Sequence, residues 1–174
     1  TLAEIKVGMT ETEVEAILLR NLFSHGADGL SFAPIVAAGD NAAKPHAHAR
    51  PDYHLKPGDP LLIDFGGTYQ GYPADITRTW PTNGRFSKPQ RDLYTIVLAA
   101  QHASIDVSRI GTPYERIHQA SVEVLTEGLL SLGLLKGSLK KNIESTAYKK
   151  FYMHKTGHWI GLDVHDVGEY KLGG

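Results

Sequence analysis

Cysteine is absent from this 174-residue sequence. Its absence excludes disulfide bonds, thiolate metal ligands and a cysteine nucleophile, so any bound metal must be held by oxygen and imidazole nitrogen. An excess of charge of either sign is also missing, because 18 Lys and Arg face 19 Asp and Glu, and the net charge is -1. This balance gives no broad electrostatic field to attract nucleic acid or an anionic membrane, and we expect neither as a partner.

Long apolar runs are missing as well. No stretch approaches the roughly 20 apolar residues that span a bilayer, and no charged and then apolar leader opens the sequence. We therefore expect a cytoplasmic protein. The sequence also lacks a Gly-rich phosphate loop and a regular alternation of strands and helices, which excludes the kinase and dehydrogenase classes.

The composition is that of a globular protein, with 41% hydrophobic and 21% charged residues, and we expect one catalytic domain over residues 1–174. Thr10 and Glu13 have the spacing of a capping box, and apolar residues then recur at helical intervals. Similar start signals precede two longer helices. The expected helices run from Thr10 to Gly26, from Ser87 to about Val107, and from a cap at Thr112 to about Leu132.

Apolar and β-branched runs at residues 30–38, 61–66 and 72–80 predict strands. The short link at residues 68–71 predicts a hairpin between the last two. Residues 151–168 contain several glycines and histidines, and we expect strand and tight loop there. Because strands and helices interleave without a regular rhythm, the predicted class is α+β.

Two aspartates on the predicted hairpin are the first chemical signal. Asp64 lies in an otherwise apolar strand, where a carboxylate is costly to bury unless it is paired or bound to a metal. A turn centred on Tyr69 and Gln70 would place Asp75 directly opposite, about 4.5–5.5 Å away between Cβ atoms, whereas a bulge at Gly71 would shift the register by one. Two carboxylates this close repel each other, so the pair needs either a shared proton or a bound cation. The alternative is structural, with both aspartates bonded to backbone groups.

Three histidines lie within twelve residues near the end of the sequence: His154, His158 and His165. A neutral imidazole is the usual nitrogen partner of carboxylates around a divalent transition metal. Only one of the three needs to be the metal ligand. The spacing of four between His154 and His158 is weak evidence by itself, because it also occurs on solvated helix faces.

Four segments match the sequence motifs of a known family. They are residues 39–46 (GDNAAKPH), 62–66 (LIDFG), 74–79 (ADITRT) and 157–168 (GHWIGLDVHDVG). Together they resemble aminopeptidase P and prolidase, the Xaa-Pro peptidases of the pita-bread superfamily. The resemblance implies an antiparallel curved sheet with helices packed outside. It also implies that the sequence lacks an N-terminal domain and ends before the two glutamates that complete the family's metal site.

In that family the positions matching Asp64 and Asp75 are carboxylate ligands of two divalent metal ions, and the position matching His158 supplies the imidazole. Asp75 would bridge both ions. The metal expected from the resemblance is Mn²⁺, with Co²⁺, Fe²⁺ or Zn²⁺ as substitutes. Without the two glutamates, we expect the printed sequence to be inactive alone.

The resemblance assigns substrate contacts to His165, His154 and His46, with His48 as a competitor for the last of these roles. The implied reaction is hydrolysis, by a hydroxide bridging the metals, of the bond between an N-terminal residue and proline. A peptide or dipeptide with proline second is thus the expected partner, and a homo-oligomer is compatible with it. Two alternatives stay open: a methionine-aminopeptidase-like peptidase, and a non-catalytic binding module of the same fold.

Overall fold

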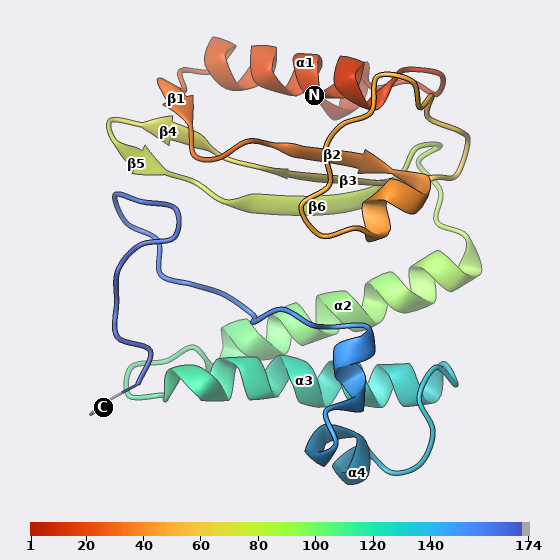
Figure 1. Cartoon of the computed structure of the whole chain (residues 1–174), viewed down its shortest axis with the longest axis vertical. Coiled ribbons are helices and arrows are strands. Elements are labelled where there is room, and N and C mark those ends of the chain that lie inside the picture. Colours follow the sequence, from red (N-terminus) through yellow and green to blue (C-terminus); the bar gives the residue numbers. More distant parts are fainter. Residues whose placement is uncertain (172–174) are drawn as a thin grey trace. The chain divides into compact units, whose positions relative to one another are not determined.

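The computed structural model describes residues 1–171 (Figure 1). Contacts between residues divide the chain into two compact units. The sheet unit comprises residues 1–87 and 159–167, and the helix unit comprises residues 88–158 and the segment from 168 onward. The single domain predicted for residues 1–174 stays a prediction, and residues 172–174 lie outside the described residues.

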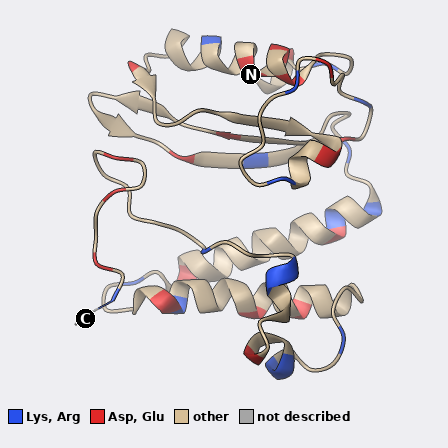
Figure 2. Ribbon diagram, in the orientation of Figure 1, with Lys and Arg blue, Asp and Glu red and all other residues tan. Residues whose placement is uncertain are grey.

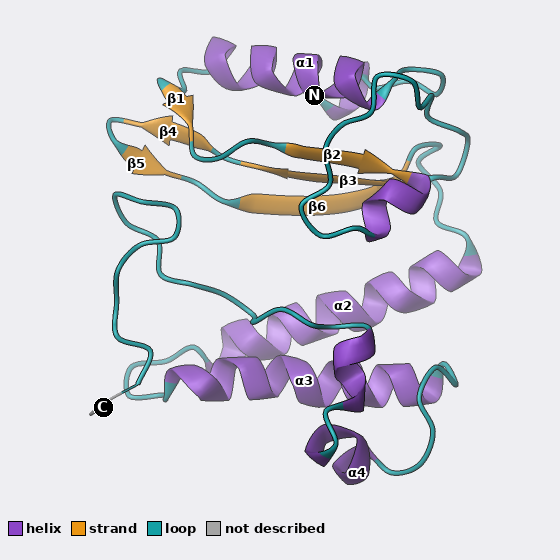
Figure 3. Ribbon diagram, viewed as in Figure 1, coloured by secondary structure: helices purple, strands orange, loops and turns teal. Residues whose placement is uncertain are grey.

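The sheet unit contains two antiparallel three-stranded sheets, with strand orders β1-β4-β5 and β2-β3-β6 (Figure 3). Helix α1 packs against β2. The elements in chain order are η1 (Leu2–Glu4), α1 (Glu11–Ser24), β1 (Gly29–Leu30), β2 (Ile35–Ala38), η2 (Gly39–Ala43), β3 (Pro60–Phe65), β4 (Gly67–Tyr69), β5 (Tyr72–Pro73) and β6 (Ile76–Pro81).

The predicted capping box begins helix α1. The Thr10 side chain accepts a hydrogen bond from Glu13 N at 3.2 Å, and Glu13 Oε2 accepts one from Thr10 N at 2.6 Å. Val14 and Leu18 then point into the core, where they meet apolar residues of β2 and β3. The buried members of this core are Val14, Leu18, Val36, Ala38, Leu55, Leu61 and Ile63.

The hairpin forms, but its turn lies one residue later than predicted. Gln70 and Gly71 are the central residues, with φ of 52° and 82°, and Tyr69 pairs with Tyr72. Two-residue hairpin turns with positive φ at both positions match the strand twist, and glycine adopts this conformation without steric cost. The register therefore places Thr77, not Asp75, opposite Asp64. The prediction of a directly opposed aspartate pair is wrong.

Two predicted strands are shorter than expected. Residues 30–38 give β1 and β2, separated by a bend at Ser31 and Phe32 and by Pro34, which has no N–H to donate to a ladder. Residues 72–80 give β5 and β6, separated at Ala74 and Asp75. Gly66 lies so close to the Ala74 carbonyl that no side chain would fit there.

The helix unit contains α2 (Lys88–Val107), α3 (Tyr114–Ser131), α4 (Leu139–Glu144) and η3 (Ala147–Lys150). The bounds of α2 agree with the prediction, whereas the predicted cap at Thr112 is wrong. The N-cap of α3 is Pro113, because its φ of -59° and ψ of 137° are not helical, and the Thr112 N–H closes the preceding turn onto the Arg109 carbonyl at 3.0 Å. Helix α4, begun by a Ser138 cap, was not predicted.

Helices α2 and α3 pack closely where small residues meet. A side chain at Gly128 of α3 would collide with Ile96 of α2. Ser104 and Ser121 join the same pair of helices through a hydrogen bond of 2.5 Å between their hydroxyls. Buried small and hydroxyl residues thus set the distance between these helices.

Residues 151–168, all of which the structure describes, contain no strand, so that part of the prediction is wrong. Backbone hydrogen bonds close a tight loop instead, from Gly161 N to Asp163 O and from Asp166 N to Trp159 O, each 3.1 Å long. These local bonds replace pairing with another strand. Basic and acidic residues are interspersed over both units (Figure 2), and no helix among the described residues is long and apolar enough to cross a membrane.

Candidate functional site

Asp64 of β3 is the half-buried acid of the predicted site. Leu61, Ile63 and Phe65 pack in or against the core, and because neighbouring side chains in a strand alternate, Asp64 faces the other way. Its cross-strand partner Thr77 donates a hydrogen bond from Oγ1 to Asp64 Oδ1 at 2.6 Å. A carboxylate on the non-core face of a buried strand is thereby held in one orientation.

The charges around Asp64 identify its neighbours. Burial raises the pKa of Asp64 above its ordinary value, and the charge of Asp75 raises it further. The hydrogen bond from Thr77 and the positive charge of His46 lower the pKa. Asp75 lies in the break between β5 and β6, outside the regular ladder, and no strand register pairs it with Asp64. The two acids are therefore electrostatic neighbours, although they are not directly opposed.

His46 is the loop histidine whose charge acts on Asp64. It follows η2 and has a left-handed backbone, with a φ of 53°. The competitor His48 lies two residues further on, and its carbonyl accepts a hydrogen bond from Asn41 Nδ2 at 3.0 Å. The substrate role of His46 stays a prediction.

His154 and His158 belong to the helix unit, in a segment that Thr156 attaches to α3. The Thr156 hydroxyl bonds to His118 Nδ1 at 2.9 Å and to the Tyr152 hydroxyl at 2.7 Å. The ring planes of His118 and Tyr152 are tilted by 33°, with centroids 5.7 Å apart. These contacts fix the turn between the two histidines.

His165 lies in the loop of residues 159–167, which belongs to the sheet unit. The Asp166 carboxylate stabilises this loop by accepting hydrogen bonds from Leu162 N at 3.0 Å and Val167 N at 2.8 Å. A side chain at Gly161 would collide with that carboxylate. The glycine and aspartate of the motif thus shape the loop that carries the histidine.

The predicted ligands are distributed over both units. Within residues 1–171, no group of three or more His, Asp or Glu side chains could hold a metal ion. Asp64, Asp75 and His46 interact within the sheet unit, whereas His158 and His154 lie in the helix unit. A pair of carboxylates suits a hard or borderline divalent cation. The ligand assignment stays a prediction.

Sequence reasoning missed Thr77 as the partner of Asp64. Gly71 was the available signal, since placing it at a positive-φ turn position fixes the register that pairs these two residues. It also missed Glu11, a fully buried acid in the first turn of α1. No local pattern indicates its partners, which lie 27–39 residues away in the sequence.

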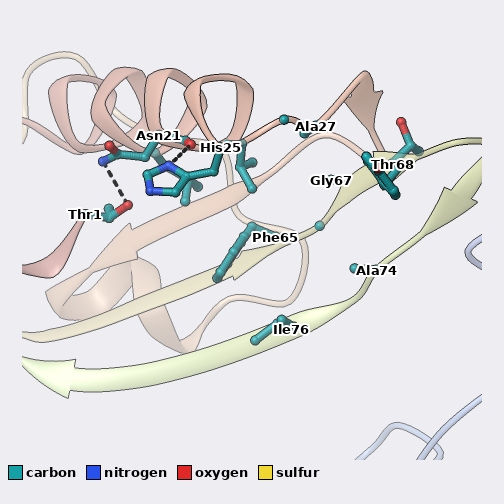
Figure 4. Close-up of a pocket in the computed structure, with 14 residues that line it drawn as sticks. Thr1, Asn21, His25, Ala27, Phe65, Gly67, Thr68, Ala74 and Ile76 are labelled. Carbon is teal, nitrogen blue, oxygen red and sulfur yellow. Dashed lines mark hydrogen bonds between the residues drawn. The ribbon is translucent and has the colours of Figure 1, made fainter.

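A pocket of about 440 Å³ lies between the end of α1 and the hairpin (Figure 4). Phe65 and Ile76, a cross-strand pair, contribute to its lining together with His25 and Asn21. Since consecutive strand residues face opposite sides, Asp64 points away from the side on which Phe65 lies. The pocket is therefore distinct from the acidic pair.

The sequence and structure resemble known proteins along nearly the whole chain. The family model described as metallopeptidase family M24 matches residues 1–173. A Xaa-Pro aminopeptidase of Haemophilus influenzae is 44% identical over 160 residues, which are 92% of this chain and 37% of the relative. One of Escherichia coli is 40% identical over 163 residues, or 94% and 37%. The chain thus spans just over a third of the length of these relatives.

Solved structures give the same result. Aminopeptidase PepP of Pseudomonas aeruginosa superposes with a TM-score of 0.94 at 44% identity, over 99% of this chain and 39% of that one. Zinc-substituted Escherichia coli aminopeptidase P in complex with product gives a TM-score of 0.92 at 38% identity, over 97% and 38%. These matches confirm the predicted α+β pita-bread fold and the resemblance to aminopeptidase P. The chain belongs to metallopeptidase family M24.

Proposed function

We propose that the protein is a metal-dependent aminopeptidase that hydrolyses the bond between an N-terminal residue and proline. The observation that carries the proposal is the half-buried Asp64 of β3, held by Thr77 and close enough to Asp75 for the charge of that residue to raise its pKa. The names of the relatives support the substrate class, since the proteins from Haemophilus influenzae and Escherichia coli are Xaa-Pro aminopeptidases.

Asp64, Asp75 and His158 are the residues that would hold two divalent cations, for which Mn²⁺ is our proposal and Co²⁺, Fe²⁺ or Zn²⁺ are substitutes. When bound, such cations lower the pKa of water and polarise a carbonyl group. Two neighbouring carboxylates repel each other in the absence of positive charge, and burial raises the pKa of Asp64. The hydrogen bond from Thr77 to Asp64 Oδ1 holds the carboxylate in one orientation while leaving lone pairs on its oxygens for a cation.

The imidazoles of His46, His154 and His165 are proposed to contact the substrate. An Xaa-Pro bond has no N–H, so an enzyme that acts on it must hold the peptide through other groups. Histidine N–H donors can bind the carbonyl oxygen where negative charge develops. The proposed substrate is a peptide or dipeptide with proline second, and the absence of cysteine is compatible with the reducing cytoplasm, where we propose the protein acts.

The test uses the natural full-length protein, depleted of metal and reloaded with Mn²⁺. It should release the first residue from an Xaa-Pro-Xaa peptide and act poorly on the matched Xaa-Ala-Xaa and Met-Ala-Xaa peptides. A metal-loaded enzyme that leaves the Xaa-Pro peptide intact contradicts the proline assignment. Preference for Met-Ala-Xaa would favour the methionine-directed alternative.

The ligand assignment is tested with Asp75→Asn, and Asp106→Asn is the matched control because Asp106 is an exposed acid of α2. Removing one charge of the acidic pair should lower the metal content measured by elemental analysis and reduce turnover at least about 100-fold, as expected for loss of a metal ligand. The control should match the wild type. Equal metal content and turnover in both variants would show that Asp75 is not a ligand.

A further inference from the structure

Glu11 is the most deeply buried acid that the proposed reaction does not use. Its exposed fraction is 0%, and its carboxylate accepts hydrogen bonds from three residues. Oε1 accepts from Ala38 N at 2.7 Å and from Arg50 Nη2 at 3.0 Å. Oε2 accepts from Asn41 Nδ2 at 3.0 Å, from Arg50 N at 2.8 Å and from Arg50 Nε at 3.2 Å. A buried carboxylate needs such compensation to remain charged.

These donors lie at both ends of one loop. Ala38 ends β2, Asn41 lies in η2, and Arg50 closes the segment of residues 39–50 that follows β2 (Figure 1). Two further bonds cross the loop, from Arg50 Nη2 to Ala38 O and from Asn41 Nδ2 to His48 O, each 3.0 Å long. One carboxylate in α1 therefore connects the entry, the first turn and the exit of the loop.

Arg50 is held on several sides. Its Nη1 lies 3.1 Å from Asp40 Oδ1, and its guanidinium stacks 3.9 Å from the centre of the Tyr53 ring. Hydrogen bonds to Glu11 raise the pKa of Arg50 above its ordinary value. The planar guanidinium provides several fixed donors at once, which an ammonium group cannot do.

His46 lies inside this loop and has a conformation that depends on its surroundings. Its φ of 53° is unfavourable for a residue with a Cβ and persists where neighbouring structure enforces it. The next residue, Ala47, is buried, which fixes the loop just after the histidine. The charge of His46 lowers the pKa of Asp64, which belongs to the same unit. The position of the imidazole relative to the acidic pair therefore depends on how the loop ends are held.

We infer that Glu11 and Arg50 are positioning residues that act through His46, because they hold residues 39–50 in the conformation that presents this imidazole to Asp64. The inference rests on the proposed function only for its effect on turnover. Its structural content, that the Glu11 contacts determine the loop conformation, is tested separately.

The structural test compares Glu11→Gln and the milder Arg50→Lys with wild type in the natural full-length protein without metal. Arg20→Lys is the matched control, since Arg20 lies on the same helix as Glu11 and forms an exposed ion pair with Glu4 of η1. We expect amide hydrogen exchange in residues 42–49 to accelerate at least about tenfold, as for opening of a local unit, while β3 and the control remain unchanged. The His46 ring signal, assigned by its loss in His46→Ala, should shift. Unchanged exchange and an unchanged ring signal in Arg50→Lys overturn the inference.

The functional test is a double-mutant cycle with the Mn²⁺-loaded protein and an Xaa-Pro peptide. Arg50→Lys should lower kcat about 10- to 100-fold at constant metal content, as expected for a misplaced catalytic group. In the His46→Ala background the same change should have less than about a twofold effect, because the group it positions is gone. Equal losses in both backgrounds would show a general structural role and overturn the inference. A loop that moves in a protein inactive on every Xaa-Pro peptide would contradict the proposed function and support the positioning role.

Discussion

Gly66→Ala would test the close approach of the Gly66 backbone to Ala74, the residue before Asp75. A Cβ at this position would lie 1.7 Å from the Ala74 carbonyl oxygen and 2.9 Å from Ser31 Oγ. Non-bonded carbon–oxygen contacts ordinarily exceed about 3 Å, so the backbone at Gly66 or at Ala74 would have to move by more than about 1 Å. The Ala74 N–H donates to Gly67 O at 3.1 Å and Ser31 Oγ at 3.0 Å, and this displacement would break both contacts.

The magnitude follows from these contacts. Overpacking costs about 1–3 kcal/mol, and each broken hydrogen bond about 0.5–1.5 kcal/mol. We expect Gly66→Ala to lower the free energy of unfolding by about 2–6 kcal/mol. Gly84→Ala is the control, since Gly84 has a φ of 72° and open space around it, and its left-handed backbone alone costs about 1–2 kcal/mol.

The assay is urea unfolding of wild type, Gly66→Ala and Gly84→Ala, followed by the fluorescence of Trp80 and Trp159. Both tryptophans belong to the sheet unit and report on its unfolding. Because Asp75 follows the displaced Ala74, Mn²⁺ affinity should also fall at least about tenfold. A Gly66→Ala variant as stable as the Gly84→Ala control would refute the close approach of Gly66 to Ala74.

Three further variants test local features. Gly128→Ala should destabilise the protein by about 1 kcal/mol, since a Cβ 2.3 Å from Ile96 Cγ2 outweighs the helix propensity gained, and a stabilised variant would contradict this. Glu13→Gln should lower the free energy of unfolding near neutral pH but not in acid. The hydrogen bond from the Thr10 N–H lowers the pKa of Glu13 below its ordinary value, so the stability that the ionised carboxylate contributes is lost as the pH falls through that lowered pKa. A difference in stability that does not change with pH would contradict this. Thr156→Val should accelerate amide exchange in residues 152–158 by removing two hydrogen bonds, and unchanged exchange would contradict the attachment to α3.

Local chemistry made several features predictable from the sequence. The Thr10–Glu13 capping box begins α1 because its partners are three residues apart. The apolar alternation of β3 places Ile63 in the core and Asp64 on the opposite face, since the side-chain period of a strand is two. The motifs around Asp64, Asp75 and the last histidines indicated the family, which the comparisons confirm.

Tertiary structure decided the features that depend on distant partners. The positive φ of Gln70 and Gly71 set the hairpin register, so that Asp64 faces Thr77 rather than Asp75. Residues 151–168 form a loop instead of a strand because their backbone bonds are satisfied locally. The sequence by itself determined the family and where most helices begin, because those signals extend over a few residues. The folded chain alone decided that Glu11 holds Ala38, Asn41 and Arg50, because those contacts join residues 27–39 positions apart.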